Sequence, residues 1–155
     1  MSNNAVPNIP RLSISNRKAG FSYELLQTFE AGIVLLGSEI KSIRQGKVNM
    51  GDAYCLFFES DLWVRNLHIS AYMEASWLNH EPMRDKKLLL KRHELRKLRH
   101  RMKEKGFTVV PTRMFISERG FAKLEIALAR GKKQHDKRES IKDRDVERDM
   151  RRDAE

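Results

Sequence analysis

The chain has 155 residues, of which 40% are apolar and 34% charged, and a formal net charge of +10. This length predicts one domain with terminal extensions. Cys55 is the single cysteine, which excludes an internal disulfide bond and favours a reducing compartment. No apolar stretch approaches the roughly 20 residues of a membrane-spanning helix, and the N-terminus lacks the pattern of a signal peptide. We therefore expect a cytoplasmic protein that makes no membrane contact.

The positive charge is concentrated in one part of the chain. Residues 1–83 contain 7 Lys/Arg and 8 Asp/Glu residues, whereas residues 84–105 contain 11 Lys/Arg and 3 Asp/Glu residues. A cationic stretch of this density favours a polyanionic partner, because its side chains displace counterions from phosphates. The alternative is a solvated cationic face without a partner. Charge alone does not distinguish DNA from RNA.

The first predicted elements are strands. Residues 1–15 contain Asn, Ser and Pro without apolar periodicity, which predicts a flexible arm. Residues 21–29 favour a strand, although a helix is an alternative. Gly32 predicts a bulge or bend, and a short second strand is expected at residues 33–36.

The next segment predicts a short helix. Ser38 can serve as its N-cap and Gly46 as its C-terminal stop. Ile40 and Ile43 lie three residues apart and share one face, so Glu39 is expected to face elsewhere. Such a helix can close one end of a sheet.

A second helix is predicted within the basic region, at residues 93–105. Leu95, Leu98 and Met102 recur at positions i, i+3 and i+7, which indicates an amphipathic helix with a narrow apolar stripe and a cationic outer face. Gly106 is a suitable residue for the end of this helix.

The remaining elements complete a mainly β domain. The sequence predicts a hairpin with arms at 52–59 and 62–69, a loop at 73–84, and strands at 107–117 and 122–129. Pro111 indicates an edge position or a bulge in the first of these last strands. With about six short strands and largely local pairing, residues 16–130 are expected to form a six-stranded OB-like antiparallel barrel with accessory α-helices.

The residues offer little support for catalysis. Cys55 lies in an apolar run without a nearby histidine and is best interpreted as a buried small hydrophobe. His93 and His100 share the basic helix, but no cysteine or carboxylate completes a metal-binding spacing. Glycine-rich phosphate loops and nucleophile elbows are absent from the sequence. We therefore expect no enzymatic activity, no metal site and no cofactor.

Several aromatic side chains could stack on unpaired bases, as occurs on small RNA-binding barrels. Most of them are expected in the core or at its rim, and one or two are expected to contact RNA. The available residues are Tyr23, Phe29, Tyr54, Trp63, Tyr72 and Trp77.

Residues 131–155 form a charged tail with 9 Lys/Arg and 8 Asp/Glu residues. So few apolar groups cannot offset the entropy of ordering, which predicts disorder in the free protein. Opposite charges recur three residues apart, which supports a helix only weakly. We interpret the tail as a segment that folds on a partner. The alternative is an extension that only aids solubility.

Several blocks of the sequence, in order along the chain, resemble the SmpB family (small protein B, the SsrA-binding proteins). Together they extend from Asn16 into the tail, and their coincidence is specific. The blocks are residues 16–19, 29–33, 37–46, 52–54, 84–90 and 131–138. The resemblance implies an OB-like barrel that binds the tRNA-like domain of tmRNA (SsrA) without enzymatic activity.

The resemblance also implies which residues of the barrel bind RNA. Asn16, Glu30 and Leu89 match family positions linked to tmRNA binding, and the cations beside these motifs extend the set. Glu30 could accept hydrogen bonds from a 2′-hydroxyl or orient a cation such as Arg17 or Lys18, or it could hold a backbone amide at a bend. Leu89 could be a core or a docking side chain. The complete expected set is Asn16, Arg17, Lys18, Glu30, Lys86, Lys87, Leu89, Lys91 and Arg92.

For the tail, the resemblance implies entry into the empty mRNA channel of a stalled ribosome, near the decoding centre of the small subunit. Gly131 is expected to act as a swivel, and His135 to stack on a base or carry charge. The expected ribosome-binding residues are Gly131, Lys132, Lys133, His135, Asp136, Lys137 and Arg138. We expect a monomeric adaptor of trans-translation. The alternative is a general single-stranded or structured RNA-binding OB protein of the translation apparatus.

Overall fold

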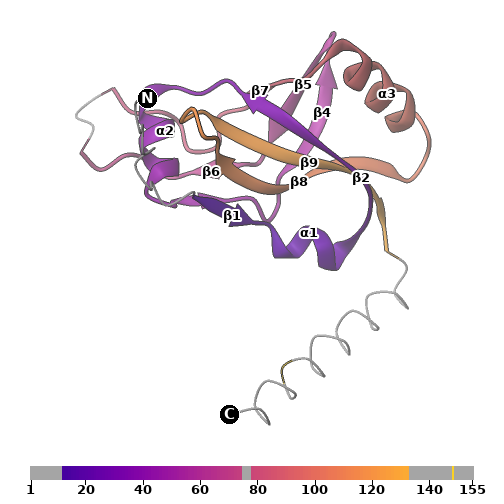
Figure 1. Ribbon diagram of the computed structural model, residues 1–155, viewed down its shortest axis with the longest axis horizontal. Helices are drawn as coiled ribbons and strands as arrows, with labels where there is room; N and C mark the ends of the chain where they lie inside the picture. Colours follow the sequence, from indigo (N-terminus) through magenta and orange to yellow (C-terminus); the bar gives the residue numbers. More distant parts are fainter. Residues whose placement is uncertain (1–11, 75–77, 133–147, 149–155) are drawn as a thin grey trace, which may run out of the picture.

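The computed structural model describes residues 12–74, 78–132 and 148. Within these residues the chain forms three helices and nine strands (Figure 1). The helices are α1 (Arg17–Ser22), α2 (Gly37–Arg44) and α3 (Arg92–Met102). The strands are β1 (Ser13–Ser15), β2 (Tyr23–Ile33), β3 (Val48–Asn49), β4 (Tyr54–Phe58), β5 (Asp61–Arg65), β6 (His68–Ile69), β7 (Lys86–Leu89), β8 (Phe107–Ile116) and β9 (Ala122–Gly131).

Six of these strands form a closed ring, which confirms the predicted OB-like barrel. Each strand pairs antiparallel with the next in the order β8, β4, β5, β7, β2, β9, and β9 returns to β8. β8 closes the ring because one of its edges pairs with β9 along its length, while its other edge is shared by β4 and β1. The β4–β8 junction is the shortest, with Cys55 opposite Val109. β3 and β6 form a separate small sheet.

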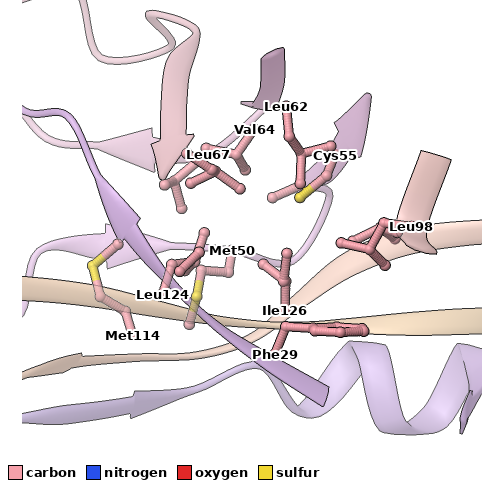
Figure 2. Close-up of a cluster of buried hydrophobic side chains, with 14 of the residues drawn as sticks. Phe29, Met50, Cys55, Leu62, Val64, Leu67, Leu98, Met114, Leu124 and Ile126 are labelled. Carbon is pink, nitrogen blue, oxygen red and sulfur yellow. The ribbon is translucent and has the colours of Figure 1, made fainter. Parts of the chain in front are cut away.

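The core is a cluster of buried apolar side chains between the strands of the ring (Figure 2). Leu62, Leu124 and Ile126 are fully buried at its centre. Leu98 of α3 is buried at one end, as its position in the apolar stripe predicted, and Ile43 of α2 is buried in the same cluster. α2 and α3 lie at opposite ends of the barrel in Figure 1.

The N-terminal part of the fold differs from the sequence expectation in two ways. Ser13–Ser15, expected in the flexible arm, forms β1 and pairs with β8. The six residues of α1 were not predicted as a helix, because Ala19 is the one buried residue in them and gives no apolar periodicity. Ala19 packs on Val110 and Ala129, on the outside of the barrel.

β2 is continuous, so the predicted break at Gly32 is wrong. The register shift lies earlier, between Leu25 and Gln27. Gly32 pairs with Leu89, and a Cβ at Gly32 would lie 3.3 Å from Leu89 Cβ. The glycine therefore permits close approach of a neighbouring side chain rather than a bend. A register shift next to Pro111 in β8 confirms the bulge predicted there.

α2 begins one residue before the predicted N-cap. The Leu36 N–H donates to the Glu39 carboxylate at 2.7 Å, which caps the helix from its third position. The Ser38 hydroxyl instead forms a hydrogen bond with His80 Nδ1 at 2.8 Å. Glu39, which was expected only to face away from the apolar stripe, is 0% exposed and forms an ion pair with Arg84 at 2.6 Å. Its partner lies 45 residues away, which local periodicity cannot show.

Candidate nucleic-acid interface

The outward side chains of β7, β2, β9 and β8 form a continuous surface, which we call the outer face. The register places Leu89, Gly32, Lys123 and Phe115 in one cross-strand row. The next row contains Glu30, Glu125 and Arg113, followed by Ser15 of β1. Residues two apart in a strand share a face. Glu30 and Leu89, which are distant in sequence, therefore belong to one surface.

Leu89 is a surface residue rather than a core residue. Its side chain lies over Gly32 and is 52% exposed, whereas the preceding Leu88 is 2% exposed and lies in the core cluster. Strand alternation explains this contrast, because successive side chains of β7 point to opposite faces. An exposed leucine held against a glycine has no evident packing role, so the docking alternative is favoured.

Glu30 lies opposite Glu125 rather than beside the cations of α1. Like charges at directly opposite positions are unfavourable, and Arg113 offsets this by approaching Glu125 at 3.3 Å. Thr112 also donates to the Glu125 carboxylate at 2.9 Å. Lys18, one of the cations suggested as a neighbour of Glu30, instead pairs with Asp52 at 2.6 Å. Glu30 is exposed and lies within β2, not at a bend.

Asn16 anchors the chain at the edge of β8. Its Nδ2 donates to the Met50 carbonyl at 3.1 Å and to the Pro111 carbonyl at 2.8 Å. Its backbone N–H donates to the Thr112 carbonyl at 2.8 Å. The two Nδ2 bonds fix the orientation of the carboxamide. Arg17 follows on the exposed surface of α1.

The structure contradicts one of the expected RNA-binding residues. Lys86 is 0% exposed, and its Nζ donates to the Leu67 carbonyl at 2.8 Å and lies 3.9 Å from Glu39. Burial lowers the pKa of Lys86 to about 8, although the nearby Glu39 carboxylate acts in the opposite direction. Lys86 shares the inward face of β7 with Leu88, so it cannot contact a phosphate. Its role is internal.

The other expected cations of this region are accessible. Lys87 lies on the outward side of β7 and pairs with Asp61 at 3.5 Å. Lys91 and Arg92 are exposed where α3 begins, and Glu94 accepts the Lys91 N–H at 3.2 Å. This hydrogen bond supplies a cap that the lysine side chain cannot provide.

α3 lies at one end of the barrel (Figure 1), and its sequence is rich in basic residues. Its buried stripe faces the core, so its other positions face solvent. Arg99 is held in place by the Glu59 carbonyl at 3.0 Å and by the ring of Phe57 at 5.5 Å. The exposed basic residues of the helix are Arg92, His93, Arg96, Lys97, Arg99 and His100. This helix follows β7 directly, so its first cations adjoin the outer face.

The tail begins later than expected. Gly131 is the last residue of β9 and pairs with Tyr23, so the predicted swivel is a strand residue. The Lys132 N–H donates to the Ser22 carbonyl at 3.1 Å, and its Nζ donates to the Gly20 carbonyl at 2.9 Å. The other five expected ribosome-binding residues lie outside the described residues: Lys133, His135, Asp136, Lys137 and Arg138.

Sequence reasoning missed several members of the outer face. Lys123, Arg113 and Phe115 share its rows, and the Arg113 guanidinium lies 4.5 Å from the centre of the Phe115 ring. Val34 and Phe121, both two residues beyond the Gly32–Lys123 pair, are exposed apolar side chains at the same end of the β2–β9 ladder. These residues could not be grouped from the sequence, because the sequence of a strand does not show which strand pairs with it. The pairing of β2 with β9 supplies that information.

Cys55 is buried as predicted, and burial raises the pKa of its thiol. In the described part of the chain, no group of three or more His, Cys, Asp or Glu residues could hold a metal ion. No helix among these residues is long and apolar enough to cross a membrane.

A closed antiparallel barrel of this kind, with a cationic helix beside an exposed strand face, defines an OB-like protein of the class that binds oligonucleotides. The family model described as SmpB protein matches residues 13–155. The chain therefore belongs to the SmpB family.

Relatives match over nearly the whole chain. The SsrA-binding protein of Bacteroides thetaiotaomicron is 55% identical over 92% of this chain and 95% of its own length. That of Anaplasma phagocytophilum is 55% identical over 86% and 90%, respectively. A chain from the solved structure described as "tmRNA-SmpB: a journey to the center of the bacterial ribosome" is 42% identical, with a TM-score of 0.68, and the match covers 83% of this chain and 94% of that chain.

Proposed function

We propose that this protein is the tmRNA-binding adaptor of trans-translation. The barrel binds the tRNA-like domain of tmRNA and accompanies it to stalled ribosomes. The tail enters the empty mRNA channel of the small subunit and permits accommodation without codon pairing. Family membership and the names of the relatives, which are SsrA-binding proteins, support this role.

The observation that carries the proposal is the exposed apolar and charged surface around Leu89. Leu89 of β7 and Lys123 of β9 both pair with Gly32 of β2, and Glu30 lies two residues before Gly32. Lys91 and Arg92 follow at the start of α3. Apolar contact with sugars or bases and phosphate contact from adjacent cations are the two components of RNA binding. We propose that the outer face together with the start of α3 contacts the folded RNA.

The role that we propose is binding and positioning, without catalysis by this chain. The peptidyl transfer belongs to the ribosome and the aminoacylated RNA. Because the proposed partners act in translation, we propose that the protein acts in the cytoplasm. We also propose that it acts as a monomer.

A competition experiment tests the proposal against the general RNA-binding alternative. Labelled tmRNA bound to the full-length protein is challenged at one fixed salt concentration with unlabelled tmRNA, an elongator tRNA and single-stranded RNA. Preferential displacement by tmRNA supports the adaptor. Equal displacement by all three RNAs supports a general RNA-binding barrel instead.

A further inference from the structure

A pocket lies beneath α1, between that helix and strands β4 and β8. Its volume is about 320 Å³, at the small end of the range for ligand sites in proteins. Its lining includes Asn16, Lys18, Ser22, Tyr23, Asp52 and Tyr54. The pocket is separate from the β7–β2 part of the outer face, because none of its lining residues belongs to the two cross-strand rows described above.

Two aromatic side chains line the pocket, together with small apolar and polar residues. Tyr23 and Tyr54 line it and pack against the buried cluster of Ala19, Val110 and Ala129. Both tyrosines are half-buried. Aromatic rings in such positions provide flat surfaces for stacking, and a nucleobase is the flat group that an RNA partner supplies.

One polar group in the pocket is fixed in a single orientation. The two Nδ2 hydrogen bonds of Asn16, to the carbonyls of Met50 and Pro111, determine which way its carboxamide points. Its Oδ1 accepts no hydrogen bond from the described residues, and Asn16 lines the pocket. A fixed acceptor beside aromatic walls suits the amino or imino edge of an unpaired base.

The rim of the pocket carries an ion pair that can open. Lys18 Nζ lies 2.6 Å from Asp52, and the two side chains are 59% and 79% exposed. Exposed pairs of this kind contribute little to stability. Lys18 can therefore turn to the phosphate of an entering nucleotide at small cost.

We infer that this pocket receives one unpaired nucleobase of a partner RNA, stacked between Tyr23 and Tyr54 and hydrogen-bonded to Asn16. The inference rests on the proposed function, since it assumes that the protein binds RNA. Two RNAs could supply the base, namely tmRNA and the RNA of the small ribosomal subunit.

Filling the pocket tests the inference directly. Ser22 lines the pocket, and its backbone carbonyl, not its side chain, accepts the Lys132 N–H. Ser22→Leu therefore occupies space without removing a described hydrogen bond. Ser60→Leu, in the exposed turn between β4 and β5, is the matched control. Both full-length variants are first compared with the parent by thermal unfolding.

The expected result is at least about fivefold weaker binding of Ser22→Leu to one of the two RNAs, because loss of a stacked base has effects of this order. Ser60→Leu should bind both RNAs as the parent does. Unchanged binding of a folded Ser22→Leu to both tmRNA and small subunits would overturn the inference.

Photocrosslinking distinguishes the two sources and separates this inference from the proposed function. In one arm the tmRNA carries 4-thiouridine and 6-thioguanosine, and in the other the small-subunit RNA carries them. Adducts on peptides containing Tyr23 or Tyr54 in either arm support the pocket. Adducts confined to other peptides overturn it while leaving RNA binding intact. Absence of any binding to either RNA would overturn the proposed function and the pocket together.

Discussion

Leu88 and Leu89 are adjacent residues, but Leu88 is buried and Leu89 is exposed. Replacing each of them in turn therefore distinguishes an effect on stability from an effect on RNA binding. Leu88→Ala should lower the free energy of unfolding by about 2–5 kcal/mol, because it leaves a cavity in the core. Leu89→Ala should change it by less than about 1 kcal/mol. Denaturant titration of the two variants checks this difference.

The affinities for tmRNA should show the reverse order. Leu89→Ala removes an exposed apolar contact and should weaken binding about three- to tenfold, whereas a folded Leu88→Ala should bind nearly as the parent does. A Leu89→Ala variant that binds normally would contradict the placement of the interface on the outer face.

The burial of Lys86 should make the stability of the protein depend on pH. The pKa of Lys86 is about 8 in the folded protein and lies near 10.5 when exposed, so between these values the unfolded chain binds a proton that the folded chain has lost. The contribution of Lys86 to the free energy of unfolding therefore rises with pH in this window, by up to about 1.4 kcal/mol per unit. Below pH 8 both states are protonated and the contribution is constant.

The measurement is the difference in unfolding free energy between the parent and Lys86→Met, followed from pH 7 to pH 10. It should shift in favour of the parent as the pH rises, and the folded variant should retain its tmRNA affinity at pH 7. A difference that is independent of pH, or a large loss of affinity at pH 7, would show that Lys86 is not an internal residue.

At the scale of elements, α3 is expected to supply phosphate contacts rather than specificity. Replacing Arg96 and Lys97 together by Gln should weaken binding to tmRNA and to other RNAs alike. The slope of log affinity against log salt should become shallower by about 1–2. Lys41→Gln with Lys47→Gln, near α2 at the opposite end of the barrel (Figure 1), is the matched control and should leave the slope unchanged. An unaltered slope in the α3 variant would exclude these two cations from the interface.

The elements also show what sequence can predict. The stripe of Leu95, Leu98 and Met102 identified α3, because a helix with one buried face leaves a periodic trace. α1 leaves no such trace, since its stability depends on Ala19 packing against distant strands. The inward position of Lys86 follows from alternation with Leu88, but the run of three leucines at 88–90 obscures that period. The sequence predicted individual residues of the site but not which of them lie close together. Glu30 and Leu89 become neighbours only through the pairing of β2 with β7.

At the scale of the whole molecule, we propose a division of labour between a barrel that binds tmRNA and a tail that acts on the ribosome. Gly131 and Lys132 belong to the barrel, since they pair with the β2 and α1 region. Ending the chain after Lys132 should therefore preserve the barrel. Ending it before Gly131 should also remove the hydrogen bonds of Lys132 to Ser22 and Gly20.

The most direct test compares the chain ending at Lys132 with the full-length protein in two assays, tmRNA affinity and peptide tagging on stalled ribosomes. We expect the truncated chain to bind tmRNA within about threefold of the full-length affinity, because the outer face and α3 remain. We also expect it to lose tagging. Loss of tmRNA binding by a folded truncated protein, or normal tagging without residues 133–155, would contradict this division of labour.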